Sequence, residues 1–313
     1  MSAIADFVWR PLGAEDQGAL VGLAAACLAA DGGLPFAADA DFMRPRFLPP
    51  APGTTLAAFD PAGALIATAA VRPDSADDAP RAIIVGLVHP DHRGRGIGAA
   101  LMRWSISQGQ ALLAEGAQAG GRGVRGGCLE IGTEGLTDAA ARLYARHGFA
   151  QEFAEDVLRR DLRQPLPEAP LPPGITLAHW EPELAGAFFA AYTASFRERP
   201  GFTEWSHDEW TDWATGDDDF RPEASFVARC GDTPAGFILC DKGWIAQLGV
   251  CPAWRGRGLG AALIVPALRY FRAAGLEAVS LGVNVDNPIA ARLYTRLGFA
   301  VIGRRARWTM ALN

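Results

Sequence analysis

Two loops rich in glycine and arginine are the stretches of this chain best suited to hold a charged ligand. They read Arg93-Gly94-Arg95-Gly96-Ile97-Gly98 and Arg255-Gly256-Arg257-Gly258-Leu259-Gly260. Each follows an apolar, strand-like run and opens a stretch with helical periodicity. Glycine lets the backbone approach a ligand closely, and the first turn of a helix presents unpaired N–H groups and a positive dipole. The loops therefore predict cradles for phosphate, most simply for a pyrophosphate.

The glycine spacing disfavours two common nucleotide-binding loops. It is neither G-x-G-x-x-G followed by an acidic residue nor G-x-x-x-x-G-K-[ST], which argues against a Rossmann unit and a P-loop. The pattern R-x-x-G-x-G between a strand and a helix instead resembles the pyrophosphate loop of the GNAT superfamily of N-acetyltransferases. Members of that superfamily bind acetyl-coenzyme A, so the resemblance implies acetyl-CoA or coenzyme A as the cosubstrate.

The cradle motif is part of a longer internal repeat. Residues 88–101 match 250–263 with an offset of 162, and residues 140–149 match 290–299 with an offset of 150. The first copy therefore has 12 extra residues, which we place in the glycine-rich stretch 116–127. Two motifs repeated in order predict tandem domains rather than a solenoid. A chain of 313 residues also suits two domains of about 150 residues each.

The repeated order of cradle loop, strand and Leu-Tyr-x-x-x-Gly-Phe helix resembles the characteristic half of the GNAT fold. It implies an α/β (α+β) protein of two tandem GNAT-like domains. Each domain is expected to have a mixed, mostly antiparallel sheet, with a central splayed pair of parallel strands, flanked by helices. We expect an N-terminal domain at 1–163, a proline-rich linker at 164–174 forming a stiff, extended spacer, and a C-terminal domain at 175–313. A closing hairpin is expected at 149–162 and a final strand pair at 299–311.

The resemblance also implies which residues bind the cosubstrate. The splayed strands of the second copy would be 244–250 and 278–283, and the exposed backbone of Leu248, Gly249 and Val250 would contact the pantetheine arm. One of those N–H groups would stabilise the oxyanion of the tetrahedral intermediate. The remaining expected contacts are Arg255, Gly256, Arg257, Gly258, Leu259, Gly260, Ala261, Asn284 and Asn287, with Leu87, Val88, Arg93, Gly94, Arg95, Gly96, Ile97 and Gly98 in the first copy.

Tyr294 is the residue that the resemblance assigns to catalysis, as the acid that protonates the departing thiolate. A thiol has a pKa of about 8.5 and a phenol of about 10, so a nearby phenol can donate as charge develops on sulfur. Its position on the face shared by Ala290, Leu293 and Leu297 is also typical of a core tyrosine. Asn287, followed by Pro288, is a helix N-cap by its sequence, and the resemblance adds a contact to the cosubstrate.

The sequence does not identify a general base. Many relatives have an acidic residue on the strand before the cradle, whereas 244–247 has none. Carboxylates that could replace it are Asp241, Glu204, Asp208 and Glu209, although each is more typical of a solvated surface. A water relay or a neutral acceptor would remove the need for a base. Trp210 and Trp213 fit either an acceptor pocket or helix packing. Cys251 invites a covalent mechanism, but the family transfers its acyl group directly within a ternary complex.

The second copy is the one we expect to be catalytic, because it has Asn284 and Asn287 and a short connection. The first copy is expected to bind acetyl-CoA without turnover, or to be structural. The predicted function is transfer of an acetyl group from acetyl-CoA to a primary amine of a small molecule. Two alternatives remain: a coenzyme A-binding sensor whose catalytic apparatus has decayed, and acetylation of a protein N-terminus or lysine.

The overall composition narrows the classes of partner and of cell compartment that we expect for this protein. A net charge of −6 argues against a nucleic-acid-binding role. Five cysteines without a C-x-x-C pair argue against a disulfide scaffold or a metal site and fit a reducing cytoplasm. The sequence has neither a signal peptide pattern nor a run of 18 apolar residues that could span a membrane. We expect a cytoplasmic monomer or homodimer.

Overall fold

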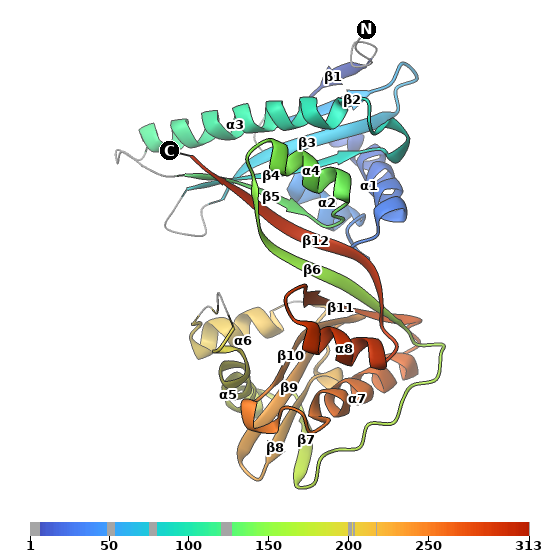
Figure 1. Ribbon diagram of the computed structural model, residues 1–313, viewed down its shortest axis with the longest axis vertical. Helices are drawn as coiled ribbons and strands as arrows, with labels where there is room; N and C mark the ends of the chain where they lie inside the picture. Colours follow the sequence, from blue (N-terminus) through green and yellow to red (C-terminus); the bar gives the residue numbers. More distant parts are fainter. Residues whose placement is uncertain are drawn as a thin grey trace. The chain divides into compact units, whose positions relative to one another are not determined.

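The computed structural model describes residues 7–48, 54–74, 80–119, 127–199, 202, 204–216 and 218–312. It divides the chain into two compact units (Figure 1). The first unit is Met1–Val157 together with Ile302–Asn313, and the second is Leu158–Val301. This division differs from the expected boundaries mainly at the C-terminal end, because residues 302–313 belong to the first unit and not to the second.

The first unit is built on a mixed sheet in the order β1-β2-β3-β4-β5-β12-β6. All the pairs with a recorded register are antiparallel except β4–β5, which is parallel. The strands are β1 (Val8–Arg10), β2 (Thr55–Phe59), β3 (Leu65–Asp74), β4 (Arg81–Val88), β5 (Cys128–Thr133), β6 (Ala150–Asp161) and β12 (Ala300–Ala311).

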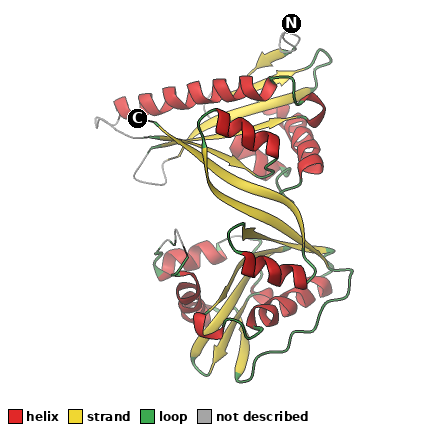
Figure 2. Ribbon diagram, in the orientation of Figure 1, coloured by secondary structure: helices red, strands yellow, loops and turns green. Residues whose placement is uncertain are grey.

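Helices cover both faces of this sheet (Figure 2). They are α1 (Gln17–Asp31), α2 (Ala40–Phe47), α3 (Ile97–Ala119) and α4 (Asp138–Arg146). Neighbouring residues of a strand point to opposite faces: Ala57 packs with α1 and α2, whereas Ala58 packs with Ile97 and Leu101 of α3. The two buried layers therefore place α3 on the face opposite α1 and α2.

The sequence prediction was wrong for the two strands at the ends of the repeats. The residues expected to form a closing hairpin and a final strand pair form two single strands of 12 residues each, β6 and β12. Opposite charges on these neighbouring strands form cross-strand ion pairs, Arg304–Asp156 at 2.6 Å and Arg305–Glu155 at 2.5 Å. Such pairs stabilise a particular strand pairing, and a local reading of either segment does not reveal them.

The second unit repeats the plan with the order β6-β11-β10-β9-β8-β7. Its pair β10–β11 is parallel, and the other recorded pairs are antiparallel. Its strands are β7 (Ile175–His179), β8 (Phe226–Cys230), β9 (Thr233–Asp241), β10 (Trp244–Val250) and β11 (Ala278–Asn284). Its helices are α5 (Ala185–Phe196), α6 (His207–Thr215), α7 (Leu259–Ala273) and α8 (Pro288–Arg296).

Alternation along β9 separates the two cores of the second unit. Ile238 and Cys240 face the apolar core under α7 and α8, whereas Phe237 and Leu239 face an aromatic core under α5 and α6. The fold is therefore the expected α/β sheet with helices on both faces and one parallel pair near its centre.

The segment expected to be a stiff spacer packs on the second unit. Leu166 and Ala169 lie against its core, and Glu168 is paired with Arg269 at 3.0 Å. Arg160, which is buried, donates to the carbonyl oxygen of Pro165 at 2.6 Å. These contacts hold residues 164–174 as part of the unit.

The extra residues of the first copy are partly helical. α3 has 23 residues, whereas its counterpart α7 has 15. Residues 116–119 of the stretch that was expected to be a loop thus belong to α3, and residues 120–126 lie outside the described residues.

Trp308 tests the assignment of β12 to the first unit. It is 8% exposed, and its ring lies edge-on to Tyr144 with centroids 5.7 Å apart. Trp308→Ala should destabilise the first unit by about 3–5 kcal/mol, because it leaves a cavity in the core. Hydrogen exchange should accelerate at the amides of β5 and stay slow in β9. Arg307→Ala, on the exposed face of β12, is the control. Loss of protection in β9 with β5 unchanged would contradict the assignment.

Candidate functional site

The second cradle loop is a left-handed turn that is open to a ligand. Gly256 and Gly258 have φ angles of 75° and 84°, which side chains other than glycine adopt only with strain. A Cβ atom at either position would meet nothing within 4 Å. The third glycine differs, because a Cβ at Gly260 would lie 2.9 Å from Cδ2 of Leu293. The first two glycines leave room for a ligand, and the third lets α7 and α8 pack closely.

The first cradle loop has the same geometry. Gly94 and Gly96 have φ angles of 74° and 85°, and a Cβ at Gly94 would meet nothing within 4 Å. A Cβ at Gly98 would lie 3.3 Å from Cδ2 of Leu143 on α4. Both copies therefore fold into the same turn for the same reasons.

The first arginine of each loop is engaged within the protein. Arg255 Nε donates to the carbonyl oxygen of Val250 at 3.2 Å, and Nη1 donates to Glu198 at 3.0 Å. In the first unit, Arg93 Nε donates to Val88 O at 3.0 Å, and its two terminal nitrogens donate to Asp31 at 2.6 and 2.7 Å. These arginines tie the loop to the preceding strand and to a residue at the end of the first long helix.

The second arginine of each loop has no recorded carboxylate partner among the described residues. Arg257 lies over the ring of Trp254, 5.0 Å from its centroid. Arg95 Nη2 donates to the carbonyl oxygen of Asp91 at 3.0 Å. The uncompensated charge of each cradle is thus on Arg95 and Arg257.

Strands β10 and β11 pair only at one end. Their register contains Trp244↔Ser280 and Ile245↔Leu281. The antiparallel register with β9 shifts between Ile245 and Gln247, so Ala246 is the extra residue of a β-bulge. From there to the cradle, residues 246–250 have no recorded partner on β11. Backbone polar groups on this side of β10 therefore face the gap between the strands.

The first unit has the splayed strands without the bulge. β4 and β5 pair from Arg81↔Cys128 to Ile84↔Ile131 and then separate. The register of β3 with β4 runs without a shift from Ala67↔Val88 to Asp74↔Arg81. Between the last parallel pair and the cradle valine, the second copy thus has one residue more than the first.

Comparison with known proteins agrees with this geometry. Residues 184–299 match the model of the acetyltransferase (GNAT) family, and residues 52–151 match a model of the acetyltransferase (GNAT) domain. A mycothiol acetyltransferase of Thermobispora bispora is 32% identical, over 94% of each chain. One of Frankia alni is 33% identical, over 95% of this chain and 92% of the relative.

The chain belongs to the GNAT family of acetyltransferases.

Solved structures support the tandem arrangement. A GCN5-related N-acetyltransferase from Sphaerobacter thermophilus is 26% identical, with a TM-score of 0.74, over 98% of this chain and 96% of that one. A tandem GNAT protein from the clavulanic acid biosynthesis pathway is 20% identical, with a TM-score of 0.63, over 97% and 98% of the two chains, and shows the fold alone. The protein is an acyl-CoA-dependent acetyltransferase with two GNAT domains, and acetyl-CoA is the donor that this family uses.

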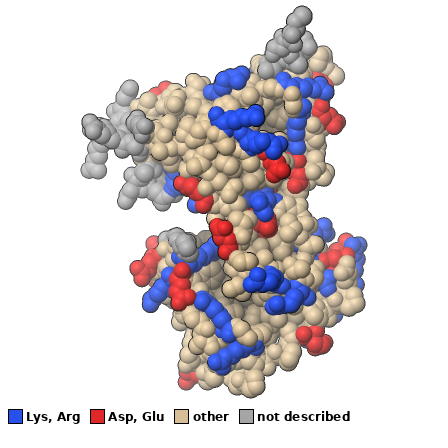
Figure 3. Space-filling model, viewed as in Figure 1, with Lys and Arg blue, Asp and Glu red and all other residues tan. Residues whose placement is uncertain are grey.

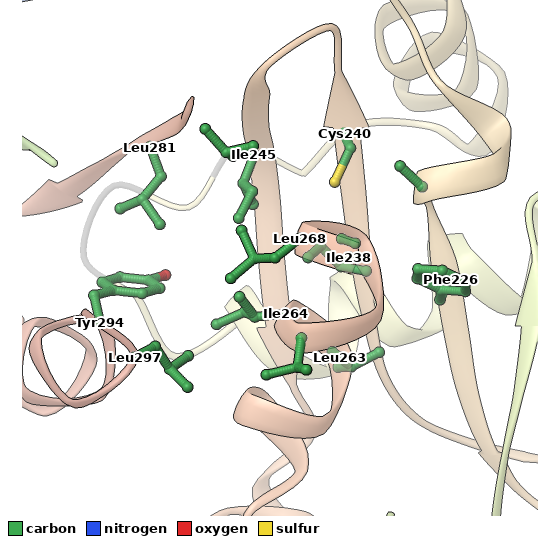
Figure 4. Close-up of a cluster of buried hydrophobic side chains, with 14 of the residues drawn as sticks. Phe226, Ile238, Cys240, Ile245, Leu263, Ile264, Leu268, Leu281, Tyr294 and Leu297 are labelled. Carbon is green, nitrogen blue, oxygen red and sulfur yellow. The ribbon is translucent and has the colours of Figure 1, made fainter. Parts of the chain in front are cut away.

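Tyr294 lies on α8 at the edge of the apolar core of the second GNAT domain. It is 7% exposed, and its ring is edge-on to Phe299 at 5.8 Å. Figure 4 shows its hydroxyl directed away from α8 into the apolar cluster, toward Leu268, with Leu281 and Ile245 to one side of the ring. The tyrosine is therefore a core residue that lies near residues of both splayed strands.

Tyr144 occupies the same position in the first domain. Burial raises the pKa of its phenol, and a hydrogen bond with Thr133 acts in the opposite direction. The side chain lines a cavity that also reaches the first cradle loop. A neutral phenol of raised pKa is a donor of hydrogen bonds at physiological pH.

Asn287 is a helix N-cap, as predicted. Its Oδ1 accepts from the backbone N–H of Ala290 at 3.1 Å, and Thr137 caps α4 by the equivalent bond to Ala140, also at 3.1 Å. The oxygen of Asn284 accepts from the N–H of Asp286 at 2.8 Å. The two copies thus build the turn before the tyrosine helix with different side chains, and the oxygens of both asparagines already have local donors.

The acidic residues considered as bases have other surroundings. Glu209 accepts hydrogen bonds from the backbone N–H and the hydroxyl of Ser206, at 2.9 and 2.7 Å, and forms a capping box. Glu204 and Asp208 are exposed. Trp210 is fully buried and donates to the Gln247 side chain at 3.3 Å, whereas Trp213 is 48% exposed. Gln247, on the splayed strand, is a polar residue that the sequence analysis did not select.

Three further features concern metal ligands, apolar helices and surface charge. The described residues contain no cluster of His, Cys, Asp and Glu able to hold a metal ion. No described helix combines the length and the apolar character that crossing a bilayer requires. On the face drawn in Figure 3, acidic and basic side chains both occur on each unit.

A substitution of Cys251 can distinguish direct transfer of the acetyl group from transfer through a covalent intermediate. Its thiol is 7% exposed, and burial raises its pKa, so the nucleophilic thiolate is disfavoured. Cys251→Ala should leave the rate of acetyl transfer close to that of the wild type. Mass spectrometry of the wild type with acetyl-CoA and no amine should find no acetyl group on this residue. An acetylated Cys251, together with an inactive alanine variant, would establish the covalent route instead.

Proposed function

We propose that the C-terminal domain transfers the acetyl group of acetyl-CoA to a primary amine of a small molecule, within a ternary complex. The observation that supports it is the bulge at Ala246 beside the splayed strands. The bulge leaves Ala246 as an extra residue opposite β9, and residues 247–250 then resume the ladder with β9 but have no recorded partner on β11. Backbone N–H groups at the gap are suited to stabilise the oxyanion that forms on the thioester.

The donor would bind along the same strand and loop. The diphosphate is placed over Gly256 and Gly258, where the space is open, with the charge of Arg257 beside it. Arg255 acts indirectly, because its guanidinium fixes the loop to Val250 and Glu198. The pantetheine arm runs from the cradle along Leu248, Gly249 and Val250. The first domain presents the equivalent cradle at Arg95 and Gly94.

Tyr294 completes the reaction in this proposal. The neutral amine attacks the carbonyl carbon, a C–N bond forms, and the C–S bond of the thioester breaks. The phenol gives its proton to the departing thiolate and is reprotonated by water, while the amine loses a proton to water. No carboxylate is required if the acceptor arrives neutral. The names of the curated relatives make a mycothiol-related amine the first acceptor to test.

The five cysteines are all free thiols, which agrees with a reducing compartment. We place the enzyme in the cytoplasm on that ground.

The two tyrosines form a matched pair of variants. Tyr294→Phe should lower kcat by about 10²-fold or more, because a general acid contributes rate enhancements of that order, with the affinity for acetyl-CoA unchanged. Tyr144→Phe should leave kcat close to the wild-type value. The measurement is thiol release from acetyl-CoA across an amine panel, with calorimetric titration of acetyl-CoA alongside. A larger loss of kcat in Tyr144→Phe than in Tyr294→Phe would indicate that the reaction takes place in the first domain. Unaltered turnover in both variants would show that neither phenol takes part in the mechanism.

A further inference from the structure

The first domain contains a cavity of about 690 Å³. It is lined on one side by the first cradle loop, at Gly94 and Gly96, and on the other by Met43 and Arg46 of α2. Residues of both β4 and β5 at the place where they separate, among them Val85 and Gly132, also line it. The cavity therefore extends to the face of the sheet covered by α1 and α2, which is the face opposite α3, and we call this part of it the chamber.

Three charged side chains line this chamber from three different elements: Arg46 of α2, Arg72 of β3 and Glu134 after β5. Arg46 donates to the carbonyl oxygen of Phe42 at 3.0 Å, and its guanidinium stacks 3.5 Å from the centroid of the Phe42 ring. The Nε of Arg72 is buried and has no hydrogen-bond acceptor among the described residues. Within the same part of the chain, no hydrogen bond or ion pair is recorded for the Glu134 carboxylate.

These charges are close enough to act on one another. Burial lowers the pKa of Arg46, and the charge of Glu134 raises it, whereas that of Arg72 lowers it further. Burial likewise raises the pKa of Glu134, against the opposing effects of Arg305 and Arg46, while Glu155 raises it further. Arg305 is already paired with Glu155 at 2.5 Å, so its charge is largely compensated.

Half-buried charges without direct partners reduce the stability of a fold. Among the other charged residues along the cavity, Arg93 is paired with Asp31, and Glu130 with Arg81 at 3.2 Å. Asp74 has an interaction of its own, and Arg142 and Arg146 are exposed on α4. Arg46, Arg72 and Glu134 are thus the half-buried charges of the chamber for which no ion pair is recorded among the described residues. A ligand of complementary charge would form charge-assisted hydrogen bonds there, which are the strong ones.

We propose that this chamber binds a small primary amine that also carries an anionic group, with the anion held by Arg46 and Arg72 and the ammonium held by Glu134. The anion is a carboxylate or a phosphate, because the planar guanidinium fork matches both. The site is specific to the first domain, since the residue matching Glu134 in the second copy is Asn284, whose oxygen accepts from Asp286 N. It does not depend on the reaction proposed for the second domain, so either proposal can fail without the other.

The test is calorimetric titration of the full chain with probes that separate the two charges. L-Glutamate and O-phosphoethanolamine carry both an ammonium and an anion, and they distinguish a carboxylate from a phosphate source. Glutarate has the anions without the amine, and butylamine has the amine without an anion. At least one of the first two should bind about tenfold or more tightly than both comparators, as the loss of one charge-assisted contact requires.

Variants locate the binding. The affinity for the bifunctional probe should fall by about tenfold or more in each of three variants, Arg46→Met, Arg72→Met and Glu134→Gln. Arg44→Met, at an exposed position of the same helix, and Glu115→Gln, exposed on α3, should bind it as the wild type does. Arg72→Met removes a half-buried side chain, so the isosteric Glu134→Gln and Arg46→Met carry the test if that variant fails to fold.

Three outcomes would overturn the proposal. The first is that neither bifunctional probe binds. The second is that a comparator with a single kind of charge binds as tightly as the bifunctional probes. The third is that Arg46→Met and Glu134→Gln, folded as judged by their thermal unfolding, retain wild-type affinity.

Discussion

The separation of two parallel strands is the constraint on which each domain depends. Parallel strands satisfy their backbone groups by continuous pairing, and β10 and β11 give up this pairing after Ile245↔Leu281. Backbone groups left without a partner are costly unless something else bonds them. In the second domain, the two strands separate at Ala246, which is the bulged residue of β10. In the function we propose, a thioester substrate supplies the hydrogen bonds that the neighbouring strand does not.

In each cradle, some residues hold the loop in place and others face the space where a ligand would bind. Arg93 and Arg255 bond back to their own strands and to acidic residues, whereas Arg95 and Arg257 keep their charge available. The third glycine of each loop is required by helix packing, since a side chain there would press on a leucine of the next helix. Residues that look equivalent in a motif therefore have different physical roles, and only some of them can contact the cosubstrate.

Local patterns were sufficient to predict the cradles, the tyrosine helices and the N-cap at Asn287, because each is determined by neighbouring residues. Non-local pairing was not predictable in this way: β6 and β12 pair through charges almost 150 residues apart in the sequence, such as Arg304 and Asp156. The acidic run at 152–156 and the basic run at 304–307 are the signal that could have indicated it. The bulge could not be predicted from the sequence, because Ala246 does not differ from an ordinary residue of an apolar strand. Glu134 was missed for a similar reason, since the charges that act on it, Arg46 of α2 and Arg305 of β12, come from distant parts of the sequence.

The most direct test of the account is deletion of Ala246, which removes the bulge and gives β10 the uninterrupted register of β4. Single-turnover acetyl transfer from acetyl-CoA should fall by about 10²-fold or more, as expected for the loss of an oxyanion donor. Coenzyme A should still bind at the intact cradle, and hydrogen exchange in β9 should stay slow, which shows that the domain is folded. A folded deletion variant that transfers acetyl groups at the wild-type rate would contradict the central claim.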